Sequence, residues 1–129
     1  MIMRKMSMRK MWAVAALAAL VFQFAGAPAA ASETEVVFKF YCAQCHGLTG
    51  KGDGPNVTKD FPVSPRNFTN AKEMDKLSDA DLKNVIMDGG PSVSKSPMMP
   101  PWGKTLSVEQ VDGLIKHLRG ICKCKGKQG

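Results

Sequence analysis

The residues of this chain with the clearest chemistry form one C-x-x-C-H run, Cys42-Ala43-Gln44-Cys45-His46. Two thiols separated by two residues can reach the two vinyl groups of a haem, and the adjacent imidazole then lies under the iron as its proximal ligand. The run therefore predicts one covalently attached haem c, held by Cys42, Cys45 and His46.

Two other uses of the cysteines stay open. One is a zinc site of four thiolates, from Cys42, Cys45, Cys122 and Cys124. Its C-x-C half is shorter than usual zinc spacing, and His46 would have no role. The other is a redox-active bridge between Cys42 and Cys45, which would predict a thioredoxin-like βαβ pattern that this sequence lacks.

Residues 1–31 have the composition of a cleaved secretory signal peptide. A basic segment over residues 1–10 precedes an apolar run over residues 11–24, and Ala29-Ala30-Ala31 offers a small-residue cleavage site. The apolar run is shorter than the roughly 20 residues that span a bilayer, although retention of the segment as an N-terminal anchor stays open. We therefore expect export to the periplasm.

Length and charge exclude several classes of protein. Residues 32–129 suffice for a single domain, here a core over residues 34–120 and a basic tail over 121–129, and are too few for a barrel enzyme or a doubly wound nucleotide-binding fold. The net charge of +7 comes from the signal and from residues 116–129, so the body of the domain is slightly acidic. No nucleic-acid-binding patch is expected.

Capping and apolar periodicity predict three helices. The first starts at Ser32 or Thr34 and runs into the C-x-x-C-H run. Capping boxes over residues 78–81 and 107–110 start the other two, and the last is predicted to stop at Gly120. Long Gly- and Pro-rich loops join them, and a covalently held haem would give such loops a core to pack on.

Five segments then carry a family resemblance, in this order: residues 38–47, 50–55, 65–69, 99–103, and 106–107 leading into the last helix. On these segments the chain resembles small monohaem class I cytochromes c over nearly all of residues 34–119. The resemblance implies an all-α class I cytochrome c fold, with three to four helices and long loops wrapped around one covalent haem.

The sixth iron ligand is sought among the methionines. Met98 and Met99 lie in a segment stiffened by Pro97 and Pro100, and neighbouring side chains on extended backbone point to opposite sides, so only one of the two can reach the iron. In the resembling family the ligand directly precedes a proline, which selects Met99 beside His46. Met98 stays the alternative.

The resemblance implies further contacts around the haem. The carbonyl of Pro55 would accept a hydrogen bond from the free N–H of His46. Arg66 and Trp102 would bind the haem propionates, with an exposed loop charge as the alternative for Arg66. His117, where the family usually has an aromatic residue, would pack between the first and last helices.

These expectations describe a periplasmic one-electron carrier and not an enzyme, because His/Met ligation leaves no open iron position for a small-molecule substrate. Its partners would be redox proteins that bind a monomer transiently, and not nucleic acid. One alternative is a dedicated haem subunit or donor of a periplasmic oxidoreductase or respiratory complex. Another is a haem ligand sensor or peroxidase-like protein.

The role of Cys122 and Cys124 is left open by the sequence. They could form a disulfide with each other, link two chains into a dimer, or lie in a frayed tail.

Overall fold

The computed structural model describes residues 32–128, so the predicted signal peptide lies outside the described residues. The helices are α2 (Glu33–Val37), the π-helix η2 (Phe38–Cys42), α3 (Ala43–His46), α4 (Ala71–Met74), α5 (Asp79–Asp88), the 3-10 helix η3 (Gly90–Val93) and α6 (Val108–Cys122). No strand occurs within residues 32–128, and the prediction of an all-α fold is confirmed. None of these helices combines the length and apolar composition needed to cross a membrane.

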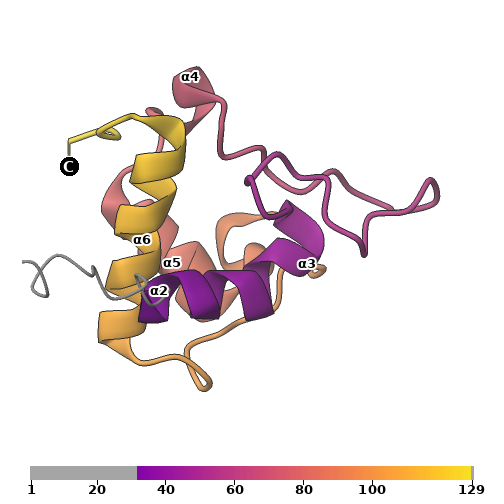
Figure 1. Cartoon of the computed structure of the whole chain (residues 1–129), viewed down its shortest axis with the longest axis horizontal. Helices are drawn as coiled ribbons and strands as arrows, with labels where there is room; N and C mark the ends of the chain where they lie inside the picture. Colours follow the sequence, from indigo (N-terminus) through magenta and orange to yellow (C-terminus); the bar gives the residue numbers. More distant parts are fainter. Residues whose placement is uncertain (1–31, 129) are drawn as a thin grey trace, which may run out of the picture. The chain divides into compact units, whose positions relative to one another are not determined.

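The first three helices follow one another without a break and carry the C-x-x-C-H run at their end (Figure 1). Ser32 starts them: its hydroxyl accepts from the Glu35 amide at 3.3 Å, and the Glu35 carboxylate accepts from the Ser32 amide at 3.2 Å. The π turn, closed by the Ala43 amide on the Phe38 carbonyl, adds a residue to the helical ladder. It thereby turns the C-x-x-C-H run relative to the buried side chain of Phe38.

The two predicted capping boxes are confirmed. Ser78 accepts from the Asp81 amide at 3.1 Å and Ser107 from the Gln110 amide at 3.2 Å. In return, each serine amide donates to the side chain of the later residue. The predicted end of the last helix at Gly120 is wrong, because α6 runs on to Cys122. An exposed glycine inside a helix weakens it without ending it.

Helices α2 and α6 cross, and the crossing is the centre of the core (Figure 1). The Phe38 ring lies 4.7 Å from the His117 ring between centroids, which confirms His117 as an interhelical contact. At Gly113 the α6 backbone lies close to the Thr34 side chain of α2, since a Cβ atom there would lie 2.7 Å from Thr34 Oγ1. The face of α6 turned to the core carries the predicted residues Val111, Leu114, Ile115 and Leu118.

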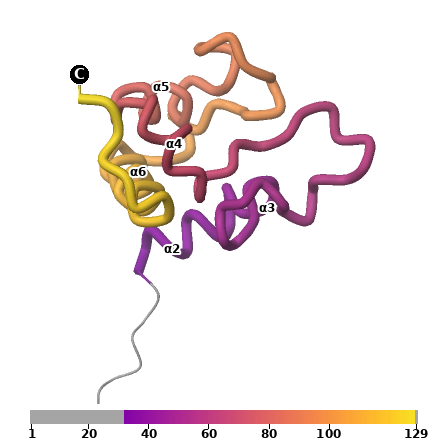
Figure 2. The backbone as a smooth tube through the Cα atoms, turned by 90° about the horizontal axis from the view of Figure 1, so that it is seen from above, coloured from indigo at the N-terminus to yellow at the C-terminus, as the bar shows by residue number. Residues whose placement is uncertain are grey.

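Long loops complete the structure around these helices. Residues 47–70 extend away from the helices before they return to α4 (Figure 2). Few of their side chains enter the core, and Phe68 is the large one that does, at 7% exposure. Such loops have little protein to pack on, which agrees with the expectation that a haem supplies part of the core.

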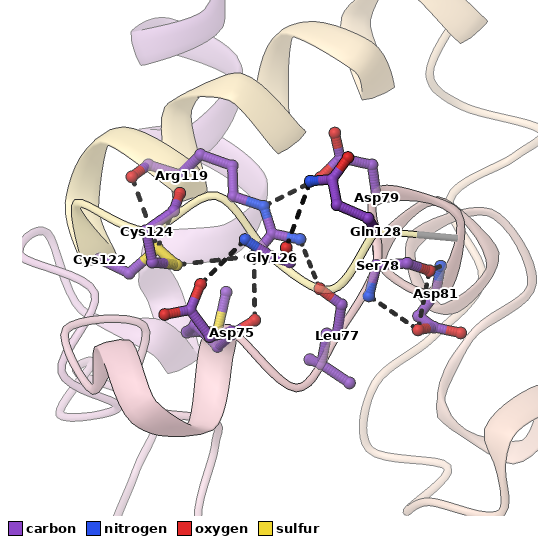
Figure 3. Close-up of polar contacts among 11 residues, drawn as sticks. Asp75, Leu77, Ser78, Asp79, Asp81, Arg119, Cys122, Cys124, Gly126 and Gln128 are labelled. Carbon is purple, nitrogen blue, oxygen red and sulfur yellow. Dashed lines mark hydrogen bonds and ion pairs between the residues drawn. A yellow bond between two sulfur atoms is a disulfide. The ribbon is translucent and has the colours of Figure 1, made fainter.

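The chain after α6, within the basic tail expected over residues 121–129, packs back onto the domain. Cys122 is buried, and it forms a disulfide with Cys124 in the same chain (Figure 3). The amides of Gly126 and Lys127 donate back to residues 75–77, so the segment is packed and not frayed. Of the three possibilities that the sequence left open, the structure has the internal disulfide.

The two glycines of α6 give a matched test of the helix crossing. Gly113→Leu should lower the free energy of unfolding by about 1–3 kcal/mol, because the added side chain must displace Thr34 and α2. Gly120→Leu should raise it by about 0.5–1 kcal/mol, because nothing lies within 4 Å of a Cβ there and glycine is a poor helix former. Chemical denaturation of the holoprotein measures both. Equal effects of the two substitutions would contradict the close approach.

Candidate functional site

Cys42 and Cys45 are half-buried free thiols at the end of the first helical segment. Burial raises the pKa of the Cys42 thiol to about 11. The two are not bonded to each other, so the structure has no redox bridge at this run. They stand on consecutive turns with His46 directly after them, which is the arrangement that covalent attachment of a haem needs.

The zinc site of four thiolates is wrong. Cys122 and Cys124 are bonded to each other, and nowhere in residues 32–128 do three or more His, Cys, Asp or Glu side chains gather as possible ligands. A structural zinc site needs about four such ligands within about 2.3 Å of the metal.

The imidazole of His46 is held in one orientation. Its Nδ1 lies 3.1 Å from the backbone carbonyl oxygen of Arg66, which can only accept, so Nδ1 carries the proton and donates. Nε2 is then the nitrogen with the free lone pair, the form that binds a metal. Burial lowers the pKa of His46, against an opposing effect of the Arg66 hydrogen bond, and so favours the neutral ring.

Phe68 covers one face of the same ring. Its centroid lies 4.3 Å from that of His46, with 19° between the ring planes. Phe68 is buried and also packs against Phe38, at 6.5 Å between centroids, so the imidazole is attached to the core formed by the helix crossing. Phe68 was not among the predicted site residues; its signal in the sequence was an aromatic residue in a polar loop, within the segment 65–69 that carries the family resemblance.

The prediction that the Pro55 carbonyl accepts from His46 is wrong, because the structure places the Arg66 carbonyl there. Residues 65–68 reach the ring by crossing the glycine-rich loop. The Phe68 amide donates to the Gly50 carbonyl at 2.6 Å, and a Cβ atom on Gly52 would lie 2.6 Å from the Pro65 carbonyl. Pro55 is exposed.

The glycine-rich loop completes the end of the helix that carries the run. Three loop amides donate to its last carbonyls: Gly52 to His46 at 2.8 Å, Gly54 to Cys45 at 3.0 Å and Asn56 to Gln44 at 2.9 Å. These carbonyls would otherwise lack partners at the helix terminus. Glycine is needed at position 54, where a Cβ atom would lie 2.6 Å from the Ala43 carbonyl.

The proline-rich segment around Met99 is bound to the end of α5. The amide of Trp102 donates to the Ile86 carbonyl and that of Gly103 to the Met87 carbonyl, both at 3.0 Å. Met99 is half-buried and packs against the core, whereas Met98 is 46% exposed. The two methionines therefore differ in burial. The predicted alternation assumed extended backbone, whereas Pro97 and Met98 lie in a turn in which the Met99 amide donates to the Ser96 carbonyl at 3.3 Å.

Trp102 connects this segment to the first helical segment. Its ring packs on Tyr41, with 5.1 Å between centroids, beside Cys42. Neither the Trp102 indole nitrogen nor the exposed Arg66 guanidinium has a hydrogen-bond partner among residues 32–128. The structure thus brings the C-x-x-C-H run together with residues 65–68 and places the segment of Met99 and Trp102 next to it, while Pro55 takes no part.

The donor set fits a covalently bound haem. Two free thiols and a neutral imidazole with an open Nε2 stand in order on one helix end. The half-buried thioether of Met99 lies on a second segment, which is hydrogen-bonded to α5. The rings of Tyr41, Phe68 and Trp102 supply aromatic surface nearby. Thiol, imidazole and thioether are the groups with which proteins attach and ligate haem c.

Comparisons with known proteins agree with this donor set. The family model described as cytochrome C oxidase, cbb3-type, subunit III matches residues 29–118, more than half of the chain. Among solved structures, the KustC0563 c-type cytochrome is similar, with a TM-score of 0.53 and 27% sequence identity over 68% of this chain and 95% of that one. No curated protein matches the chain.

Proposed function

We propose that this protein, which belongs to the family described as cytochrome C oxidase, cbb3-type, subunit III, is a periplasmic one-electron carrier with axial ligands His46 and Met99. It is a small class I c-type cytochrome with covalently bound haem c. Haem-based electron transfer is what the family supports. The attachment residues, the axial ligands and the periplasmic location belong to the proposal. The observation that carries the proposed iron site is the His46 imidazole beside two free thiols, with Nδ1 bonded to the Arg66 carbonyl and Nε2 left to bind iron.

Cys42 and Cys45 attach the haem in this proposal, each through a thioether bond. When bound, the haem iron supplies one-electron exchange between Fe(III) and Fe(II). The chain's own contribution is to keep the ligand geometry fixed in both states. The η2–α3 segment does this for the thiols, because the glycine-rich loop holds its end through three backbone hydrogen bonds.

His46 is the proximal ligand in the proposal, and the Arg66 carbonyl is its orienting partner. A backbone acceptor on Nδ1 fixes the tautomer and increases the donor strength of Nε2. Phe68 stacked on the ring hinders its rotation. The imidazole is therefore preorganised, which keeps the reorganisation on electron transfer small.

Met99 is proposed as the distal ligand in preference to Met98. It is the methionine that packs towards the core, and its carbonyl accepts from the Gly90 amide at 2.8 Å, which anchors the segment to η3. Thioether ligation raises the reduction potential relative to two imidazoles. Arg66 and Trp102, whose side-chain donors have no protein partner in residues 32–128, are proposed to bind the propionates.

The partners of such a domain are redox proteins, as the family suggests. We infer a monomer that binds them transiently after removal of residues 1–31. The matching family, described as a subunit of an oxidase, favours one second candidate, in which this protein is the donor or haem subunit of a respiratory oxidase or another periplasmic oxidoreductase. Isolation of the native protein distinguishes the two: a carrier elutes alone, whereas a subunit elutes with a much larger partner.

Removal of the two thiols should make the haem extractable. In cells with a haem c maturation system, C42S/C45S should yield a protein whose haem leaves in acid–acetone, since no thioether bond holds it. C122S/C124S is the matched control and should keep its haem through the same extraction. Haem retained by the first variant would contradict the attachment.

The two methionines should differ sharply in the oxidised spectrum. Met99→Ala should abolish the far-red absorption band of Met-ligated iron, lower the reduction potential, and allow carbon monoxide to bind rapidly to the reduced protein. Met98→Ala should keep the band and exclude carbon monoxide. The reverse pattern would transfer the ligand role to Met98, and rapid carbon monoxide binding by the unaltered protein would favour a ligand sensor.

A further inference from the structure

The chain turns back on itself directly after α6 at a disulfide that the electron carrier does not use. Cys122 and Cys124 are bonded across Lys123, which caps the helix in the left-handed conformation at φ 52° and ψ 40°. Residues other than glycine rarely adopt this conformation. The covalent bond between its two neighbours holds Lys123 there and directs the chain after it.

The redirected chain, residues 123–127, lies across the turn between α4 and α5 (Figure 3). We call it the return segment. The Gly126 amide donates to Asp75 Oδ1 at 3.0 Å, and the Lys127 amide donates to the Leu77 carbonyl at 3.2 Å. These two hydrogen bonds hold the end of the return segment against the α4–α5 turn.

Arg119 lies beneath the return segment, with its side chain 12% exposed. Its guanidinium bonds to three groups on the α4–α5 turn: the Met74 carbonyl at 2.9 Å, the Leu77 carbonyl at 2.6 Å and the Asp79 carboxylate at 2.9 Å. A Cβ atom on Gly126 would overlap this guanidinium, so the return segment covers it directly. The family match ends at residue 118, before Arg119 and the return segment.

Each sulfur atom of the disulfide lies near a group of Arg119 that would stabilise the free thiol or thiolate after reduction. Cys122 Sγ lies 3.4 Å from the Arg119 carbonyl, which would accept from a thiol formed there. Cys124 Sγ lies 3.6 Å from Arg119 Nη1, a cation that would stabilise a thiolate. Cys122 is buried and Cys124 is half-buried, so Cys124 Sγ is the atom open to attack from solution.

We propose that Cys122–Cys124 is a second redox site, a reversible disulfide that exchanges with a dithiol and thereby releases the return segment. One thiolate of the dithiol attacks Cys124 Sγ, the S–S bond breaks, and Cys122 leaves and takes up a proton. The second thiolate of the dithiol then attacks its own bound sulfur, which frees the Cys124 thiol and closes the dithiol into a disulfide. Two electrons and two protons pass to the protein.

Hydrogen exchange of the holoprotein tests this site. The protein is equilibrated with mixtures of reduced and oxidised dithiothreitol, with ascorbate in every sample so that the iron is ferrous throughout. Reduction should increase the number of thiols that an alkylating reagent modifies by two. It should also speed hydrogen exchange at the Gly126 and Lys127 amides by about tenfold or more, while the amides of α5 stay protected. Reoxidation should restore both.

The variant C122S/C124S supplies the matched control. Its Gly126 and Lys127 amides should exchange rapidly in every mixture, since no bond is left to respond to dithiothreitol. Two outcomes would overturn the proposal: a disulfide that dithiothreitol does not reduce in the native holoprotein, or a reduced protein whose return segment keeps its protection. Because the iron state and the haem attachment are the same in all samples, failure here is distinct from failure of the electron-carrier function.

Discussion

The hydrogen bond from His46 Nδ1 to the Arg66 carbonyl is the contact on which the arrangement of the site depends. In the neutral ring, which burial favours, it places the proton on Nδ1 and leaves Nε2 as the ring nitrogen able to bind a metal. The bond requires that residues 65–68 cross the glycine-rich loop, and Phe68 then stacks on the same ring. The loop, in turn, closes the end of the helix that carries His46.

The remaining elements support this one placement. Phe68 connects the imidazole to Phe38, and Phe38 connects it to His117 at the crossing of α2 and α6. The segment of Trp102 approaches the same helix through Tyr41. A small domain with long loops is thus organised from the proximal side, and the covalent haem of the family supplies apolar surface that the loops themselves do not.

Local features of this structure could be predicted from the sequence. The capping boxes at Ser78 and Ser107 depend on residues three positions apart, and the apolar face of α6 follows from helical periodicity. The resemblance to class I cytochromes c supplied the fold, and it placed His117 correctly between two helices. Met98 and Met99 differ in burial as expected, although the segment forms a turn and not the extended backbone on which that expectation was based.

Contacts between distant residues could not be predicted in the same way. Pro55 was expected to face His46, yet which of two loop carbonyls reaches the ring depends on how residues 65–68 cross the glycines. The disulfide between Cys122 and Cys124 is local in the sequence. Its proposed role depends on the packing of Arg119 against the α4–α5 turn, which lies about 40 positions earlier in the chain than Arg119. Sequence spacing carries no information on either approach.

The most direct test of the central contact is the NMR signal of the His46 Nδ1 proton in the reduced, diamagnetic holoprotein. The structure predicts a slowly exchanging proton with nuclear Overhauser contacts to Arg66 and to the Phe68 ring. A proton that exchanges rapidly, or one whose contacts lead to Pro55, would contradict the account.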